Sequence, residues 1–277
     1  MSVGAGGRVS AGPEVVPAVL VMARAPRRGE VRHALELLIG LDGCVALQTA
    51  LLAEAMRWAR AFEPRALYVA HEPADAGHDL QRLVGDDVTL FPQNGDGIAG
   101  RVADAVARVS AHSSGPVFVV WPDLPRFNRI HAQAAKLDLA TGADLVLGPV
   151  FDGGYYLIAL ARPLPSLFAL PEQVWRGPDS FNQVLTAAGR AGLEVGLLRA
   201  ERALHRPDDV RAALADPLLR KRSVHSAGLC ISRTVRMSDT APEGDRTRIL
   251  TSSGTQAMSA PGTAQSPPSG PTSMVQR

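Results

Sequence analysis

Two aspartates stand just beyond apolar runs that have the composition of strands. Asp123 follows the run 117–121, and Asp152 follows the run 144–148 and precedes two glycines. In an open α/β sheet, ligands bind beyond the carboxyl ends of the strands, and carboxylates there can hold a divalent cation that a nucleoside diphosphate also coordinates. We therefore predict that Asp123 and Asp152 form one catalytic and metal-binding site, with Mg2+ or Mn2+ as the cofactor. Two structural alternatives stay open: Asp123 as a helix cap or turn residue, and Asp152 in an Asp-Gly hairpin turn.

A loop rich in cations, Ala23–Arg32, follows the first apolar run of the chain. Backbone amides and guanidinium groups together neutralise the charge of a diphosphate, so such a loop can wrap phosphates. A solvated basic loop is the alternative, because charge runs are usually solvated. The predicted nucleotide-binding residues of this loop are Ala23, Arg24, Ala25, Gly29 and Arg32, with Arg28 as a further candidate on the phosphate side.

A second polar loop, Gln93–Gly97, leads into a helix that begins near Ile98. A glycine-rich loop at a helix N-terminus favours anions or hydrogen-bonding nucleobases. We predict that Gln93 binds the nucleotide and that Arg101 lies near its base or ribose. A plain helix cap by Asp96 explains the loop equally well.

The segment 147–158 combines a glycine pair with an aromatic pair. Adjacent glycines let the backbone come close to a ligand or adopt a positive φ, and the aromatic residues then return to a strand. We predict that Gly153, Gly154 and Tyr155 contact the substrate.

Short runs with strand composition alternate with segments of helical period, which is typical of a mainly parallel sheet covered by helices. The predicted strands are Ala18–Ala23, Ala66–His71, Val88–Phe91, Val117–Trp121, Asp144–Gly148, Tyr155–Leu160 and Glu194–Leu198. One predicted helix carries Leu52, Ala55, Met56, Ala59 and Phe62 on one face, and the others are Ile98–Ala111, Asn128–Leu139, Asp179–Arg190 and Pro207–Leu214.

The bulk composition fits one large α/β domain. The chain has 277 residues, of which 46% are hydrophobic, and its net charge is only +2. A balance this close to neutral favours a small-molecule ligand over nucleic acid. Segments 1–16 and 221–277 are predicted to be disordered because they lack a pattern of large apolar residues, which leaves 17–220 as the domain.

The two cysteines, Cys44 and Cys230, lie far apart and suggest neither a disulfide framework nor a zinc site. The early apolar stretch Val15–Ala25 is too short to span a bilayer and lacks the flanks of a signal peptide. We therefore expect a cytoplasmic protein without a membrane span.

Together, these segments resemble the bacterial glycosyltransferase-like proteins associated with arsenosugar biosynthesis, within the nucleotide-diphospho-sugar transferase superfamily. The resemblance is strongest over 146–149 and 152–158, and it extends to 29–32, 207–210, Asp123 with Pro125, and Gln93 with Arg101. It implies a GT-A fold, a Rossmann-like three-layer α/β/α sandwich. It also implies that the first loop contacts the nucleotide and its phosphates and that Asp123 is a metal ligand.

The chain departs from the family pattern at three places. Ala34 stands where the family has a phosphate-binding arginine. Trp121 and Pro122 replace a Gly-Thr pair. The family's Asp-Val-Asp-Thr segment is replaced by the four residues Ala203–Arg206. A divalent cation with fewer hard oxygen ligands binds more weakly. His205 is a candidate for one of the vacated ligand positions.

These observations predict a metal-dependent transferase that uses a nucleotide-activated sugar donor and a small-molecule acceptor, with the cation shielding the diphosphate leaving group. One alternative is a nucleotidyltransferase of the guanylyltransferase type, which would act on a nucleoside triphosphate. Another is a nucleotide-binding protein that has lost the chemistry. If the two aspartates share an empty site, Asp123→Asn should leave the unliganded protein as stable or more stable, because it relieves repulsion.

Overall fold

The computed structural model describes residues 15–176 and 179–217 of the chain. The ends predicted to be disordered, 1–16 and 221–277, lie outside these residues apart from positions 15 and 16. The proposed domain limits at 17 and 220 therefore stay predictions.

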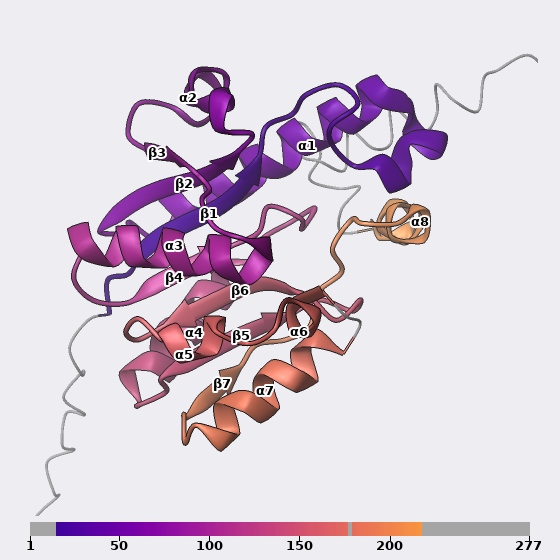
Figure 1. The fold of residues 1–277 in the computed structure, drawn as a ribbon. Helices are drawn as coiled ribbons and strands as arrows, with labels where there is room; N and C mark the ends of the chain where they lie inside the picture. The colour runs from indigo at the N-terminus through magenta and orange to yellow at the C-terminus, as the bar shows by residue number, and fades with distance from the viewer. Residues whose placement is uncertain (1–14, 177–178, 218–277) are drawn as a thin grey trace, which may run out of the picture. The chain divides into compact units, whose positions relative to one another are not determined.

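Seven strands form one sheet in the order β3-β2-β1-β4-β6-β5-β7 (Figure 1). Strand β6 pairs antiparallel with β4 and β5, whereas the other pairings are parallel. Their bounds are β1 Ala18–Arg24, β2 Ala66–Glu72, β3 Thr89–Pro92, β4 Val117–Val120, β5 Leu145–Pro149, β6 Tyr155–Leu160 and β7 Val195–Leu197. The central strands are buried on both faces, which is why their sequences are continuous apolar runs rather than alternating ones.

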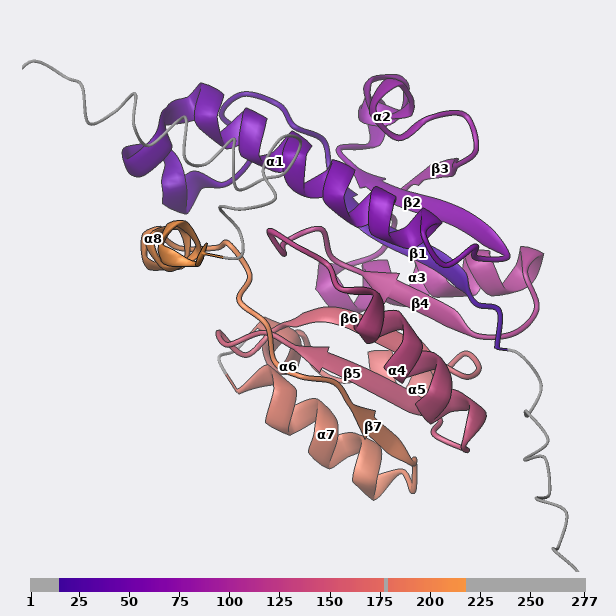
Figure 2. The ribbon, with the colours of Figure 1, turned by 180° about the vertical axis from the view of Figure 1, so that it is seen from behind.

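Helices cover both faces of this sheet (Figure 1, Figure 2). Side chains alternate between the two faces along a strand, so Val19 and Val21 of β1 enter one core while Leu20 and Met22 enter the other. The first core includes α1 Glu36–Arg60, α2 Gly77–Val84 and α4 Arg129–Ala140. The second includes α3 Gly97–His112, α5 Pro165–Phe168, α6 Glu172–Arg176 and α7 Ser180–Arg190.

A third apolar cluster joins the start of α1 to α8, Pro207–Ala215. Leu204, which precedes α8, is fully buried in this cluster beside Val31 and Leu35. Figure 2 shows α8 next to the first half of α1. This packing holds the segment before α8 close to the loop that follows β1.

The predicted α/β class and the three-layer sandwich with a mainly parallel sheet are confirmed, and all seven predicted strands are present. The sequence analysis missed α2, α5 and α6, which have 8, 4 and 5 residues and are too short for a clear helical period. Phe62 lies beyond the end of α1 at Arg60.

The segment His33–Arg60 is, by length and composition, a helix that could cross a membrane. Within it, Gly40 interrupts α1 with a φ of 70°. Leu47, Leu51 and Leu52 of α1 are buried in the cores of the domain. This packing accounts for part of the apolar composition of the helix, since Leu37 is exposed.

Candidate functional site

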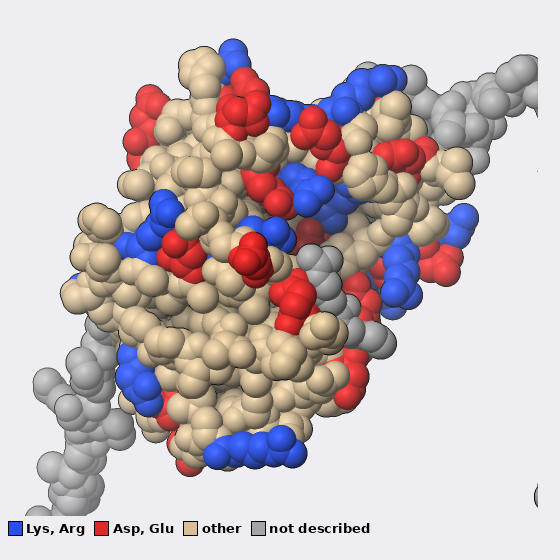
Figure 3. Space-filling view, viewed as in Figure 1, with Lys and Arg blue, Asp and Glu red and all other residues tan. Residues whose placement is uncertain are grey.

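The carboxyl ends of β1, β2 and β4 open onto a pocket of about 540 Å³. Its lining residues are Met22, Arg24, Val31, Arg32, His33, Ala34, Gln48, Glu72, Gln93, Ile98, Arg101, Val102, Trp121, Pro122, Asp123 and His205. Over the face drawn in Figure 3, basic and acidic side chains are intermingled rather than gathered by sign. The charges that a ligand would meet are therefore those of the lining residues themselves.

Asp123 is held from the side of the first loop by Arg32. Arg32 Nη2 lies 2.6 Å from Asp123 Oδ1, and the Arg32 side chain is only 9% exposed. The same guanidinium donates to Gln48 Oε1 and to the carbonyls of Pro122 and Leu204. Four contacts nearly saturate its five N–H groups, so Arg32 orients Asp123 and has little left to offer a phosphate.

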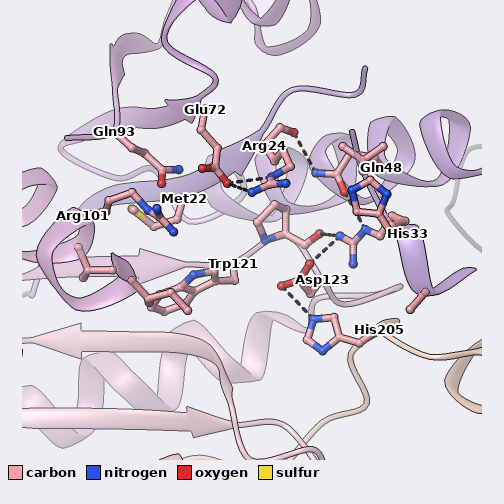
Figure 4. A pocket seen from close by; sticks show the side chains of 16 residues that line it. Met22, Arg24, His33, Gln48, Glu72, Gln93, Arg101, Trp121, Asp123 and His205 are labelled. Atoms are coloured by element: carbon pink, nitrogen blue, oxygen red, sulfur yellow. Dashed lines mark hydrogen bonds and ion pairs between the residues drawn. The ribbon is translucent and has the colours of Figure 1, made fainter. Parts of the chain in front are cut away.

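His205 lies between Asp123 and Asp152 and contacts both. Its Nδ1 lies 2.6 Å from Asp152 Oδ2, and its Nε2 lies 3.3 Å from Asp123 Oδ2. An ionised carboxylate only accepts hydrogen bonds, so both ring nitrogens must donate and the ring is an imidazolium. The predicted convergence of the two aspartates thus occurs, with His205 as the group that joins them (Figure 4 shows the Asp123 contact).

These contacts shift the pKa of each member of the cluster. Burial alone would raise the pKa of the Asp123 carboxyl, but the charges of Arg32 and His205 hold it well below its usual range. The hydrogen bond from His205 lowers the pKa of Asp152 against a smaller opposing effect of burial. Burial would lower the pKa of His205, yet its bonds and charge interactions with Asp123 and Asp152 raise it to about 10.

Residues of a different character line the other end of the pocket. Figure 4 shows Met22, Gln93, Arg101 and Trp121 at this end, away from Asp123 and His205. The Gln93 amide nitrogen donates to the carbonyls of Ala23 and Ala70 at 3.2 and 3.0 Å. Both amide hydrogens are therefore used, and the free oxygen can only accept a hydrogen bond.

Arg101 and Arg24 supply the cations nearest to this end and to the middle of the pocket. Among the described residues, Arg101 has no hydrogen-bond or ion-pair partner. The Arg24 side chain is 48% exposed and lies 2.6 Å from Glu72 Oε1. The Arg101 guanidinium thus remains available to an anion, whereas Arg24 also donates to the Glu30 carbonyl and would share its charge with Glu72.

The structure brings together four of the seven predicted nucleotide-binding residues: Arg24, Arg32, Gln93 and Arg101. The other three are not among the lining residues. Ala23 and Ala25 are buried in the core, and Gly29 lies in an exposed turn with a φ of 77°. Arg28 is also turned away and pairs with Asp42.

The predicted substrate residues Gly153, Gly154 and Tyr155 lie in and after the turn of the β5–β6 hairpin, outside the pocket lining. The Tyr155 hydroxyl donates to the carbonyl of Ser180, and Gly153 has a φ of 95°. The hairpin alternative for Asp152 is therefore correct, and the same turn delivers Asp152 to His205. A substrate role for these three residues stays a prediction.

The sequence offered Asp123 and Asp96 as helix caps, and neither side chain makes a capping hydrogen bond. Asn128, not Asp123, caps α4. Asp96 has the N-cap position of α3 but makes no side-chain cap bond there. The carboxylate of Glu172 accepts from the Ile98 amide at 3.0 Å, so an anion from α6 already occupies the N-terminus of α3.

Sequence reasoning missed Gln48 and Glu72. Gln48 is buried on α1 and links Arg32 to the carbonyl of Arg24. Its signal was a polar pair, Gln48 and Thr49, in the otherwise apolar stripe 44–52. Glu72 is the last residue of β2. Ligands bind at the carboxyl ends of the strands in an open α/β sheet, so the position that pointed to Asp123 also points to Glu72.

The geometry does not fit a divalent cation shared by Asp123 and Asp152. The ring of His205 lies between their carboxylates, and Arg32 holds the other oxygen of Asp123. Within 15–176 and 179–217, no group of three or more His, Cys, Asp or Glu side chains could hold a metal ion. One feature points the other way, because Asp152 Oδ1 is buried without a hydrogen-bond partner among the described residues.

Part of the chain matches a family of known sequences. Residues 56–171 match a family described as "Uncharacterized protein conserved in bacteria (DUF2064)". That segment includes β2 to β6, with Gln93, Arg101, Asp123 and Asp152. No curated protein matches the chain in sequence.

A solved structure shares the fold. A protein from Desulfovibrio desulfuricans G20, assigned as a nucleotide-diphospho-sugar transferase, is 22% identical, with a TM-score of 0.70 over 80% of this chain and 97% of that chain. 4-Diphosphocytidyl-2C-methyl-D-erythritol synthase from Anaerococcus prevotii DSM 20548 is more distant, with 8% identity and a TM-score of 0.48 over 73% and 97% of the two chains. The first likeness establishes the fold, and the second carries no weight.

Proposed function

We propose that this chain is a transferase that acts on a nucleotide-activated donor, and that the donor is a nucleotide sugar. The observation that carries the proposal is the pocket at the carboxyl ends of β1, β2 and β4, where Arg24, Arg101 and Gln93 face the same space as Asp123. Open α/β sheets bind their ligands at this edge. The fold shared with the protein from Desulfovibrio desulfuricans G20 supports the same proposal.

The end of the pocket near Trp121 suits a nucleobase. The half-buried Trp121 and the apolar side chains of Met22, Ile98 and Val102 offer surfaces on which a planar ring can pack. Gln93 Oε1 can accept a hydrogen bond from a base N–H, and Arg101 can donate to a base oxygen or ring nitrogen. A base that offers a donor next to an acceptor fits this pair.

The middle of the pocket suits the diphosphate, and its far end suits the transferred group. Arg24 would neutralise the phosphates and the charge that develops on the leaving diphosphate. Asp123 is a carboxylate fixed by Arg32 and His205, so it would orient the transferred group through hydrogen bonds rather than take up a proton. The acceptor would approach from the open side of the pocket.

A divalent cation stays a prediction of the family resemblance. The described residues do not fit one at Asp123 and Asp152. The same contacts favour a second candidate function, a nucleotide-binding protein without transfer activity, since both oxygens of Asp123 are already engaged.

A thermal-shift screen tests the proposal. Nucleoside diphosphates, nucleotide sugars and nucleoside triphosphates are added with EDTA and with Mg2+ or Mn2+, because a ligand that binds only the folded state raises the Tm. Product analysis then separates the activities: a nucleoside diphosphate indicates sugar transfer, pyrophosphate indicates nucleotidyl transfer, and binding without product indicates a binding protein. Absence of any shift across the panel would overturn the proposal.

A further inference from the structure

The N-terminus of α3 is occupied by a carboxylate from a distant element. Both oxygens of Glu172, in α6, lie 3.0 Å from the Ile98 amide nitrogen, and one lies 3.5 Å from that of Ala99. The N-cap residue Asp96 makes no side-chain cap bond, so Glu172 takes that role from 74 positions away. Free N–H groups at the start of a 16-residue helix therefore donate to a group of the chain itself.

The loop before α3 leaves room for this carboxylate. Gly97 has a φ of 67°, and a Cβ added there would overlap the carboxylate of Glu172. On the side of α6, Trp175 is buried and stacks on Phe168 with the ring centroids 5.5 Å apart. The second core therefore anchors α6, and Gly97 admits its side chain to the helix end.

This helix end borders the pocket. Because α3 follows β3, which is parallel to β2, it begins at the edge of the sheet where the pocket lies. Ile98, Arg101 and Val102 of α3 line the pocket. A helix N-terminus attracts anions, and so does a guanidinium such as that of Arg101, which has no partner among the described residues. Without Glu172, nucleotide phosphates would meet both features at this end.

Glu172 removes that attraction. A carboxylate at a helix N-terminus offsets the partial positive charge there, fills the place of a ligand anion and repels a second one. A nucleobase is uncharged, so it meets no such repulsion beside Ile98 and Trp121. The phosphates are left to the middle of the pocket, beside Arg24.

We propose that Glu172 is a specificity-determining residue of the pocket, which closes the N-terminus of α3 to phosphate and leaves this end to the nucleobase. The proposal rests on the proposed nucleotide site and deepens it, because it sets the direction in which the nucleotide lies. Glu172 is not among the lining residues, so it acts by occupying the helix end rather than by contacting the base.

Nuclear magnetic resonance of the full chain, labelled with 15N, tests the proposal. The amide signals of Ile98 and Ala99 are followed during titration with inorganic pyrophosphate in EDTA, so this readout does not depend on which nucleotide binds. One variant, Glu172→Gln, removes the charge but keeps an oxygen that can accept from Ile98, and the other, Glu172→Ala, empties the helix end. Glu194→Gln is the matched control, because Glu194 is exposed and outside the lining.

In the wild-type chain and in Glu194→Gln, we expect pyrophosphate to leave the signals of Ile98 and Ala99 nearly unchanged. In Glu172→Ala both signals should shift and saturate, with a pyrophosphate Kd at least about tenfold lower than that of the wild type. Glu172→Gln should show a weaker gain, because its amide still fills part of the helix end. Isothermal titration with UDP, GDP, CDP and ADP should show that the preference of the wild type for the best nucleotide over pyrophosphate falls at least about tenfold in Glu172→Ala.

An equal response of the two signals in the wild type and in Glu172→Ala would overturn the role of Glu172, and a nucleotide that still binds would leave the proposed function standing. If circular dichroism shows that Glu172→Ala does not fold, Glu172→Gln decides, and signals as unresponsive as those of the wild type would refute the proposal. If none of the four nucleotides binds to the wild-type chain, the proposed function falls, and with it the assignment of this end to the nucleobase.

Discussion

Arg32 and His205 contact the Asp123 carboxylate from two sides, and these contacts change the expected effect of replacing Asp123 on stability. From the sequence alone, two neighbouring acids would repel each other and Asp123→Asn would relieve the repulsion. The ion pairs of Asp123 with Arg32 and His205 lead us to expect the opposite effect for the unliganded protein.

Asp123→Asn should therefore lower the stability of the unliganded protein by about 2 kcal/mol, since it leaves the buried Arg32 without its charge partner. Chemical denaturation of the two proteins measures this difference. Asp42→Asn is the matched control, because the Asp42 pair with Arg28 is exposed, and it should change nothing measurable. Equal stability of Asp123→Asn and wild type would show that the ion pair does not form.

Arg101 is the lining cation whose function is easiest to separate from stability. It has no partner among the described residues, so Arg101→Ala should leave the Tm unchanged while weakening nucleotide binding about tenfold or more. Arg108→Ala, on the same helix and paired with Asp104 outside the pocket, should leave binding unchanged. Equal affinity for the two variants would remove Arg101 from the ligand site.

The His205 cluster also makes stability depend on pH. The pKa of His205 is raised from 6.5 to about 10, so its contribution is complete below pH 6.5 and is lost as the pH rises toward 10. The lowered pKa values of Asp123 and Asp152 act at the acidic end, where their contribution is lost as pH falls below the ordinary carboxyl range.

The Tm difference between wild type and His205→Asn should therefore be largest near pH 6 and should shrink as the pH approaches 10. Groups that titrate in both proteins cancel in this difference. A Tm difference that stays constant over this range would mean that His205 does not carry its charge into the alkaline region.

At the scale of elements, the loop between β1 and α1 forms one wall of the pocket. Ala34 is exposed in the short 3-10 helix His33–Leu35 and lines the pocket, at the position where the resembled family has an arginine. A cation placed there would face the same space as Arg24.

Ala34→Arg should strengthen binding of a nucleoside diphosphate about threefold to tenfold by adding a guanidinium contact to the phosphates. Titration of both proteins with the best nucleotide from the screen measures the gain. Ala53→Arg, at an exposed position of α1 outside the lining, controls for the change in net charge. Unchanged affinity of Ala34→Arg would remove this part of the loop from the phosphate site.

Elements that could be predicted from the sequence are those with a strong local pattern. The strands were found because each is a short apolar run, and Asp123 was found because it follows β4 directly. The contacts that define the site could not be found this way. Arg32 meets Asp123 across 91 positions and His205 meets Asp152 across 53, and no local pattern links such residues. The contact of Glu172, in α6, with the N-terminus of α3 could not be predicted for the same reason.

At the scale of the whole molecule, the sheet order explains why distant segments meet at one edge. Strands β1, β2 and β4 are neighbours with parallel directions, so the loops after them converge. Packing of α8 against α1 adds the segment before α8 and brings His205 to the same edge. We propose that this convergence forms the nucleotide site.

A crystal structure of the chain with the nucleotide that gives the largest thermal shift tests that claim most directly. We predict electron density for the base beside Trp121 and Gln93, and for the diphosphate beside Arg24. Density in another hollow of the domain, around Arg126 and Glu201, with the pocket at β1 and β4 empty, would contradict the claim.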